Sequence, residues 1–442
     1  MLKKVSLASL GCSKNLVDSE HMLGILEGAG YEIVADEEEA DVLIVNTCTF
    51  IESAKTESIE CILELARYKE ENCKALIVTG CMAQRYKEQI LSEMPEVDAV
   101  VGVNEYDKIA EIISRLNENQ SGILCCGDAY MSDEGIARRR TTPSYTAYLK
   151  IAEGCDNHCT YCAIPSIRGR YRSRKLEDIV AEAGMLAAEG VKEVVVIAQD
   201  TTRYGKDLYG EYKLPQLLEA LCAIDGFEWV RVHYCYPELV TDELIAVFAK
   251  EEKLCKYFDI PIQHCSDNVL KKMGRRTNKA QIVSLIEKIR KEIPEAIIRT
   301  SLIVGFPGET EEDFEELCYF VREMKIERLG VFAYSREEDT PAYNMENQIG
   351  EEEKERRRDI IMMLQTEISE EISSAKVGSV VRVLVEDRDE IIKSYYGRSY
   401  ADSEEIDGKV FFKSDRKLAG GEFVDVFIEQ AMEYDLFGRE NI

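Results

Sequence analysis

The chain has 442 residues, which is enough for two to four domains with buried cores. It carries 84 acidic and 55 basic residues, a net charge of −29, so free nucleic acid is an unfavourable partner and a basic protein a favourable one. No apolar run is long enough to span a membrane, and Met1-Leu-Lys-Lys leads into a strand rather than a signal peptide, so we expect a cytoplasmic protein without a membrane partner.

The first segment, residues 1–118, alternates strands with helices and predicts a doubly wound α/β domain. We expect strands at 4–10, 42–45, 75–78 and 97–103 and helices at 15–29, 60–69, after 84 and at 106–116. The apolar runs are short and rich in Val and Ile, as buried parallel strands require.

Three cysteines of this segment follow the predicted strands by one to three residues: Cys12, Cys48 and Cys81. The carboxyl ends of parallel strands meet at one edge of a sheet, where such folds bind ligands. Three thiolates from three strands can therefore converge on one metal centre. The alternative is three separate buried cysteines, although those would fall inside strands rather than beyond them.

Residues 119–144 have the composition of a linker, with Asn, Gln, Ser and Gly followed by acidic residues and then by Arg138-Arg-Arg-Thr-Thr-Pro. We interpret the arginine run as solvated linker charge.

From residue 145 to 374 the strand–helix alternation occurs about six times, which predicts a partial parallel (βα)6 barrel with its chemistry at the carboxyl ends of the strands. The expected strands are 147–152, 193–198, 230–234, 258–261, 297–304 and 328–333. The expected helices are 176–188, 215–223, 242–249, 279–293, 311–324 and 351–374.

Cys155, Cys159 and Cys162 follow the first barrel strand with C-x3-C-x2-C spacing. Thiolates select iron–sulfur clusters or zinc over hard cations. Three of them can hold three irons of a cubane and leave the fourth iron open to a small molecule. A structural zinc site is the alternative, but zinc needs a fourth ligand, and the nearby His158 is adjacent to Cys159 and poorly placed to share its metal.

This cysteine spacing resembles the signature of radical S-adenosylmethionine (SAM) enzymes, in which the open iron chelates SAM. The resemblance implies that Tyr161 is the aromatic residue of the cluster loop. It also implies that Gln199 and Gln263, at the ends of the second and fourth strands, contact SAM. Gly305 and Gly308, after the fifth strand, let the backbone approach a ligand and resemble the segment beside the adenine.

The last segment, residues 375–442, has a different pattern. Short strands are expected at 380–385, 394–399, 409–412 and 422–430, with glycines at the turns, which predicts a small OB-like β-barrel. It resembles a TRAM domain, often a nucleic-acid-binding module. From residue 376 onward, however, ten Lys and Arg face fifteen Asp and Glu, whereas a nucleic-acid-binding module is expected to be basic.

The whole chain resembles the methylthiotransferase family of radical SAM enzymes, through the motifs around Cys12, Cys48 and Cys81 and the three domains in order. The resemblance implies two [4Fe-4S] clusters. One lies on Cys155, Cys159 and Cys162 with SAM, and an auxiliary one lies on the other three cysteines and serves the inserted sulfur. No catalytic residue beyond these cluster ligands is implied.

Within this family, Gly11-Cys-Ser-Lys-Asn and Cys162-Ala-Ile-Pro-Ser-Ile-Arg-Gly-Arg resemble the branch that adds a methylthio group to the β-carbon of an aspartate in ribosomal small-subunit protein twelve. The acidic surface also favours such a basic ribosomal protein, free or within the subunit. The resemblance further implies a reduced electron donor such as flavodoxin or ferredoxin. The alternatives are a transfer RNA adenosine methylthiotransferase, a non-catalytic ribosome-associated iron–sulfur module and a zinc scaffold.

Overall fold

The computed structural model describes residues 2–127, 135–404 and 406–441. The chain divides into two compact units. Unit 1 comprises residues 1–142, 152–172 and 335–343, and unit 2 comprises residues 143–151, 173–334 and 344–442. Each unit is described by itself.

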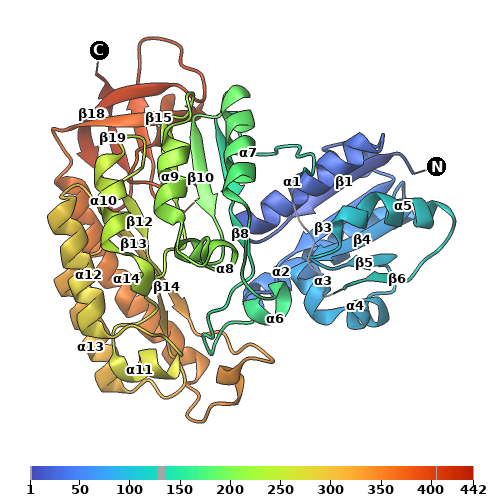
Figure 1. Ribbon diagram of the computed structural model, residues 1–442, viewed down its shortest axis with the longest axis horizontal. Coiled ribbons are helices and arrows are strands. Elements are labelled where there is room, and N and C mark those ends of the chain that lie inside the picture. Colours follow the sequence, from blue (N-terminus) through green and yellow to red (C-terminus); the bar gives the residue numbers. More distant parts are fainter. Residues whose placement is uncertain (1, 128–134, 405, 442) are drawn as a thin grey trace. The chain divides into compact units, whose positions relative to one another are not determined.

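Unit 1 contains a parallel six-stranded sheet with the order β2-β1-β3-β4-β5-β6 (Figure 1). Its strands are β1 (Lys4–Ser9), β2 (Glu32–Ile33), β3 (Val42–Thr47), β4 (Ala75–Gly80), β5 (Ala99–Val101) and β6 (Ile123–Cys125). Every residue of β3 and β4 is buried, because helices cover both faces of the sheet. The expectation of a doubly wound α/β domain is confirmed.

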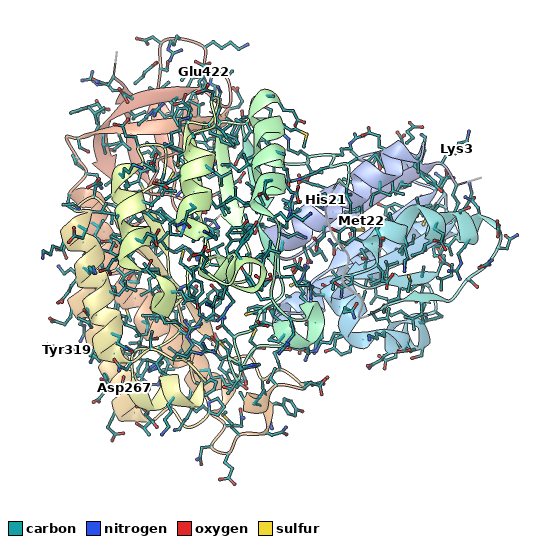
Figure 2. The ribbon with its side chains drawn as sticks, in the orientation of Figure 1. Lys3, His21, Met22, Asp267, Tyr319 and Glu422 are labelled. Atoms are coloured by element: carbon teal, nitrogen blue, oxygen red, sulfur yellow. The ribbon has the colours of Figure 1, made fainter. Side chains whose placement is uncertain are left out.

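Successive residues of each strand point to opposite faces of this sheet and belong to two separate cores. Val42 and Ile44 belong to a core that includes Met22 of α1 (Figure 2) and side chains of α5, whereas Leu43 and Val45 pack with α2, α3 and α4. The helices are α1 (Ser13–Gly28), α2 (Glu52–Ala66), α3 (Cys81–Tyr86), α4 (Glu88–Glu93) and α5 (Ile109–Asn117). The helix expected from residue 60 begins eight residues earlier, in a polar turn that lacks an apolar period.

The segment expected as a linker, residues 119–144, is partly integral to unit 1. Ile123–Cys125 forms β6 and pairs with β5 at the edge of the sheet. The interpretation of the arginine run as solvated charge is wrong for Arg138, whose Nη2 lies 2.6 Å from Oε2 of the fully buried Glu20 side chain. A buried carboxylate requires such a partner. Residues 128–134 of this segment lie outside the described residues.

Unit 2 contains the six parallel strands expected of the partial barrel, in two hydrogen-bonded sets (Figure 1). The first set orders β11 (Trp229–Val232), β10 (Glu193–Ile197) and β7 (Thr146–Lys150). The second orders β12 (Tyr257–Asp259), β13 (Ile297–Val304) and β14 (Arg328–Ala333). A parallel bridge between Val230 and Leu254 joins β11 to the approach of β12.

Helices connect these strands, as parallel pairing requires. They are α7 (Leu176–Ala188), α8 (Lys206–Tyr209), α9 (Leu214–Cys222), α10 (Asp242–Lys250), α11 (Asp267–Lys272), α12 (Lys279–Glu292), α13 (Glu311–Met324) and α14 (Glu351–Ser374). The longest, α14, is strongly polar, and among the described residues no helix is both long enough and apolar enough to cross a membrane.

The end of the chain forms a closed five-stranded β-barrel with the order β15-β16-β17-β19-β18. Its strands are β15 (Val380–Asp389), β16 (Ser394–Arg398), β17 (Val410–Lys413), β18 (Phe423–Ala431) and β19 (Leu436–Glu440). Val383, Val385, Val410 and Val426 fill its core. The predicted small barrel is confirmed, and the additional strand β19 closes it by pairing parallel to β17.

Candidate functional site

Cys12, Cys48 and Cys81 follow three neighbouring strands of the unit 1 sheet. Cys12 caps the start of α1 after β1, Cys48 comes directly after β3, and Cys81 is the first residue of α3 after β4. Because β1, β3 and β4 are adjacent and parallel, the three thiols lie at one edge of the sheet. They also act electrostatically on one another, with Cys12 affecting the pKa values of Cys48 and Cys81.

Two glycines at this edge allow the backbone to lie close to neighbouring strand ends. A Cβ on Gly11 would lie 2.6 Å from Cys48 Cβ and 2.9 Å from its Sγ, and one on Gly80 would lie 2.3 Å from Asn46 Oδ1. Both have positive φ values, 87° and 93°. A side chain at Gly11 would therefore displace Cys48 and strain the backbone.

A fully buried asparagine fixes the loops that carry the first two cysteines. Asn15 Nδ2 donates to the carbonyl of Leu10 at 3.0 Å and to that of Thr47 at 2.9 Å. These carbonyls belong to the ends of β1 and β3. Asn15 therefore holds the residues that precede Cys12 and Cys48 in a single arrangement.

Arg168 brings a positive charge to these thiols from the segment that follows the second cysteine group. Its side chain is 2% exposed, and its Nε lies 3.4 Å from Cys81 Sγ. Nη1 contacts Asp18 Oδ2 at 2.9 Å and Glu153 Oε2 at 3.0 Å, and Nη2 donates to Asn15 Oδ1. The guanidinium is thus held in one orientation by partners on three sides.

The local charges separate the pKa values of the three thiols. Burial would raise the pKa of Cys12, but Lys14 and Arg168 lower it below its ordinary value. Burial raises the pKa of Cys48, and it raises that of Cys81 to about 12 although Arg168 opposes the change. Thiolate is therefore most readily formed at Cys12.

Cys155, Cys159 and Cys162 lie on one loop of unit 1 between β8 (Ala152–Glu153) and α6 (Ile164–Arg168). The amide of Cys155 donates to the carbonyl of Gly169 at 3.1 Å, and that of Cys162 donates to the carbonyl of Cys159 at 3.1 Å. The first bond closes the base of the loop and the second forms a turn. Tyr161, which lies in that turn, is half-buried.

The short segment 335–343 of unit 1 contacts this loop. The amide of Ala342 donates to the carbonyl of Thr160 at 2.8 Å, next to Tyr161. Glu337 forms a buried ion pair with Arg85, four residues after Cys81, with Nη1 and Oε2 3.0 Å apart. The segment is thereby attached both to the cysteine loop and to α3.

The structure places the other expected SAM contacts, Gln199, Gln263, Gly305 and Gly308, in unit 2. Gln199 follows β10 by two residues and is half-buried. Gln263 is also half-buried and has φ 73°, an uncommon value for a residue with a side chain. Its amide donates to Ser301 and its carbonyl accepts from Ile303, so it lies beside β13. Strained residues of this kind concentrate at functional sites.

Gly305 and Gly308 have φ values of 73° and 75°, as the expected turn requires. The space at each glycine is used by a lysine of the same unit. A Cβ on Gly305 would lie 2.3 Å from Lys354 Cγ, and one on Gly308 would lie 2.7 Å from Lys272 Nζ. The glycines therefore admit these lysine side chains, which is a packing reason for glycine that does not require a ligand.

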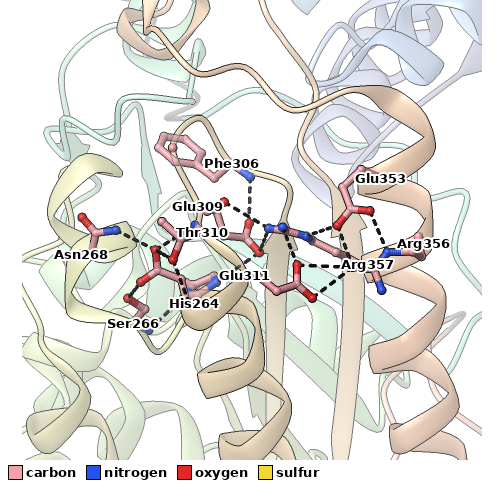
Figure 3. Close-up of polar contacts among 12 residues, drawn as sticks. His264, Ser266, Asn268, Phe306, Glu309, Thr310, Glu311, Glu353, Arg356 and Arg357 are labelled. Atoms are coloured by element: carbon pink, nitrogen blue, oxygen red, sulfur yellow. Dashed lines mark hydrogen bonds and ion pairs between the residues drawn. The ribbon is translucent and has the colours of Figure 1, made fainter.

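A buried polar network holds this turn against α14 (Figure 3). Glu309 accepts from the amide of Phe306 at 3.0 Å, and its Oε1 lies 3.0 Å from Arg357 Nη1. Arg357 also pairs with Glu353 and Glu311. His264, adjacent to Gln263, is fully buried, with Nε2 3.9 Å from the same Glu309 oxygen. The network therefore joins the segment of Gln263 and the turn of Gly305 and Gly308 to one helix.

The two cysteine triads suit iron–sulfur clusters in donor chemistry. The sheet edge supplies three mutually interacting thiols, and Gly11 makes room for Cys48 beside its neighbours. Within the described ranges, no three His, Cys, Asp or Glu side chains are already spaced as ligands of one metal ion. Cluster ligation by the six cysteines is therefore a prediction.

Sequence reasoning missed Lys14, Asn15 and Arg168 as parts of the site, although all three lie within motifs that the sequence analysis singled out. The sequence signal that could have indicated them is a positively charged or amide side chain within a few residues of a candidate cysteine ligand. Nothing in the spacing shows that Arg168 reaches Cys81, since 87 residues separate them.

Three family models match successive parts of the chain. An uncharacterized protein family, UPF0004, matches residues 4–102, the radical SAM superfamily matches residues 149–321, and the TRAM domain matches residues 377–440. The chain therefore contains a radical SAM domain followed by a TRAM domain, as expected.

Curated relatives match almost the full length. The chain is 56% identical over 436 residues to the ribosomal protein uS12 methylthiotransferase RimO of Clostridioides difficile (strain 630), covering 98% of each chain. It is 52% identical to the protein of the same name from Thermoanaerobacter sp. (strain X514), covering 99% of this chain and 100% of the relative.

Solved structures show the same fold at low identity. The radical S-adenosylmethionine methyltransferase TsrM from Kitasatospora setae has a TM-score of 0.58 at 15% identity, covering 77% of both chains. The cobalamin-dependent S-adenosylmethionine radical enzyme OxsB has a TM-score of 0.51 at 11% identity, covering 82% of this chain and 56% of that one. These likenesses establish the fold alone.

Proposed function

The chain belongs to the RimO family of ribosomal protein uS12 methylthiotransferases, and from that premise we propose that it adds a methylthio group to the β-carbon of an aspartate in uS12. The structural observation that carries the proposal is the pair of cysteine triads in unit 1. One triad ends three neighbouring parallel strands, and the other occupies a single short loop. Each triad offers three thiolates, which can hold three irons of a cubane and leave the fourth open.

We assign a [4Fe-4S] cluster and SAM to Cys155, Cys159 and Cys162, as membership of the radical SAM superfamily implies. We assign a second, auxiliary [4Fe-4S] cluster to Cys12, Cys48 and Cys81. When bound, these groups supply hydrogen-atom abstraction and a place for the incoming sulfur. The β-hydrogen of an aspartate is a poor target for a base, because the adjacent carboxylate opposes a carbanion.

The residues of the chain hold and orient these groups. The thiolates supply the ligands, and Lys14 and Arg168 bring positive charge to the auxiliary triad. Gly11 and Asn15 allow the ends of β1 and β3 to lie close together. Backbone hydrogen bonds close the loop that carries Cys155, Cys159 and Cys162. In unit 2, Gln199, Gln263, Gly305 and Gly308 are our candidates for SAM contacts. Because lysine side chains occupy the space beside the two glycines, we expect the backbone groups of Gly305 and Gly308 to be the atoms that contact SAM.

The charge of the molecule supports a basic protein substrate. The net charge of −29 and the acidic last barrel attract a ribosomal protein and repel free RNA. We place the reaction in the cytoplasm, where ribosomal protein is found, and propose a flavodoxin or ferredoxin as electron donor.

Mass spectrometry of uS12 tests the proposal. The anaerobically reconstituted protein is incubated with small ribosomal subunits or free uS12, SAM, sulfide and dithionite. We expect an added methylthio mass on one aspartate of uS12. The Cys159→Ala variant should retain the auxiliary cluster and form neither product nor 5′-deoxyadenosine.

Other outcomes would contradict the proposal in distinct ways. The same mass on an adenosine of transfer RNA would assign the RNA-modifying activity instead. Iron without SAM cleavage would indicate a non-catalytic iron–sulfur module, and zinc in place of iron would indicate a scaffold.

A further inference from the structure

Arg168 links the segment of one cysteine triad of unit 1 to a thiol of the other. It ends α6, which begins two residues after Cys162, and its Nε–H group reaches Cys81 Sγ at 3.4 Å. One side chain therefore belongs to the segment of one triad and contacts a thiol of the other. Every group in this contact lies within unit 1.

The surroundings leave little freedom to the guanidinium. Asp18 and Glu153 bind Nη1, and Asn15 binds Nη2, so the Nε–H group is directed to the sulfur. The Asp18 carboxylate is 6% exposed and that of Glu153 is 16% exposed. Because its partners already fix the guanidinium, the Arg168 side chain loses little conformational entropy when it bonds to a thiolate.

Apolar packing holds the same two elements together. Cys81 forms a small buried cluster with Val103, Ala163 and Ile167. Ala163 and Ile167 belong to the start and body of α6, and Cys81 begins α3. The contact of Arg168 with Cys81 is therefore supported by packing on both sides of it.

We propose that Arg168 is a positioning residue that sets the reduction potential of the auxiliary cluster by donating a hydrogen bond from Nε to Cys81 Sγ. The inference depends on the proposed function only in assigning that cluster to Cys12, Cys48 and Cys81. Arg168 is not a ligand, and it acts through one.

The physical basis is charge stabilisation at a ligating sulfur. Reduction adds negative charge to a cluster, and hydrogen bonds and positive charge at its sulfurs stabilise that form and raise the potential. A charge-assisted bond inside a buried site is stronger than one in water. The carboxylates of Asp18 and Glu153 offset the positive charge of Arg168, but they contact Nη1 and not the Nε–H group that contacts the sulfur.

The test measures the auxiliary cluster alone, in the full chain with Cys155, Cys159 and Cys162 changed to Ala. After reconstitution with iron and sulfide, its potential is obtained by dithionite titration followed by electron paramagnetic resonance. In this background we expect Arg168→Gln to lower the potential by about 59 mV or more, a tenfold change in the reduction equilibrium. Arg168→Lys keeps the charge and should give an intermediate value.

Arg170→Gln is the matched control. Arg170 lies two residues further along with an exposed side chain, so its loss should leave the potential unchanged. Equal potentials in Arg168→Gln and Arg170→Gln would overturn the inference. If the control itself binds no iron, the assignment of the auxiliary cluster fails, which is a separate result.

A second variant addresses folding, since Arg168→Gln leaves Asp18 and Glu153 without their shared cation. Arg168→Gln combined with Asp18→Asn removes one charge of each sign. We expect this pair to fold with the control's iron content and still show the lowered potential. A restored potential would mean that Arg168 serves only to neutralise Asp18, and would also overturn the inference.

Discussion

Gly11 shows how a single residue can decide whether the auxiliary triad forms. Gly11→Ala would place a Cβ 2.6 Å from that of Cys48 at a φ of 87°. We expect a loss of stability of about 1–2 kcal/mol from the backbone alone. Iron should fall from about eight atoms per chain to about four, because the auxiliary cluster is lost.

Gly28→Ala is the control for this change, measured by iron analysis and by chemical denaturation. Gly28 is the last residue of α1, and a Cβ built there meets open space among the described residues. Alanine should stabilise the helix end by about 0.5–1 kcal/mol and leave iron unchanged. Full iron content in Gly11→Ala would show that Cys48 tolerates displacement.

Two neighbouring arginines of α14 should differ in how much their loss destabilises the protein. Arg357 is 6% exposed and pairs with Glu309, whereas Arg356 is 46% exposed and bonds exposed carboxylates. Arg357→Ala leaves Glu309 buried without its cation and should cost about 3–5 kcal/mol. Arg356→Ala should cost less than about 1 kcal/mol.

The same pair tests the expected SAM contacts, by urea denaturation and equilibrium dialysis with SAM. Glu309 holds the turn of Gly305 and Gly308, so Arg357→Ala should also disorder this turn and weaken SAM binding. We expect the dissociation constant to rise at least about tenfold, which corresponds to about 1.4 kcal/mol of binding free energy. Unchanged SAM affinity in a folded Arg357→Ala protein would remove this turn from the binding site.

At the scale of elements, β10 is joined to the last barrel through one buried carboxylate. Glu193 of β10 contacts Arg231 of β11 at 2.8 Å and Arg398 of β16 at 2.7 Å, and both side chains are nearly inaccessible. Burial would raise the pKa of Glu193, but Arg398 and Arg231 lower it to about 2. The ionised form is therefore the one that the fold stabilises.

This carboxylate predicts a dependence of stability on pH. Since the pKa of Glu193 is lower in the folded chain than its usual value of 4.5, its contribution is present above pH 4.5 and disappears as the pH falls towards 2. At pH 7 we expect Glu193→Gln to cost on the order of 3 kcal/mol, and the difference from the native chain to shrink below pH 4.5. Urea unfolding at several pH values measures it, and a difference that is constant with pH would refute the assignment.

Much of the element pattern could be predicted because βα units have a strong local signature. The bounds of β13, α13 and α14 agree with the sequence expectation, and α13 has the capping residue Thr310 at its start. β19 was missed because Leu436–Glu440 is short, although it forms a hairpin with β18, which ends at Ala431. The start of α2 was missed because its first turns carry polar residues.

The site was predictable to a different extent. The positions of Cys12, Cys48 and Cys81 followed from strand ends, since topology alone brings parallel ends together. The contact of Arg168 with Cys81 depends on tertiary packing of α6 on α3, which no local pattern contains. Likewise, the lysine that fills the space at Gly305 comes from a helix 49 positions later and leaves no trace in the motif.

At the scale of the whole molecule, the net charge of −29 predicts how uS12 is captured. Opposite charges accelerate association, and salt screens them beyond about 8 Å at physiological ionic strength. Between 50 and 500 mM salt we expect the association rate with uS12, measured by stopped flow, to fall at least about tenfold.

Charge variants at the exposed end of β15 and in the turn that follows it give this prediction a control. Asp387→Asn with Glu390→Gln should slow association at low salt, whereas Lys393→Gln should accelerate it. A rate that does not vary with salt would show that capture relies on apolar contact.

The division of the chain into units was not predictable from composition. We expected residues 145–374 to act together, but 152–172 and 335–343 pack in unit 1. The short stretch 143–151 and the long stretch 173–334, both of unit 2, interrupt unit 1. Composition shifts mark linkers, whereas here the boundaries fall inside continuous βα repeats.

This interleaving has a consequence for how the protein is made. The N-terminal sheet is synthesised before two partners of its unit, Arg168 for Asp18 and Glu337 for Arg85. Asp18 therefore gains this cation only after residue 168 has been made, and Arg85 gains its carboxylate only after residue 337. A chain cut after residue 142 would lack both of these charged partners.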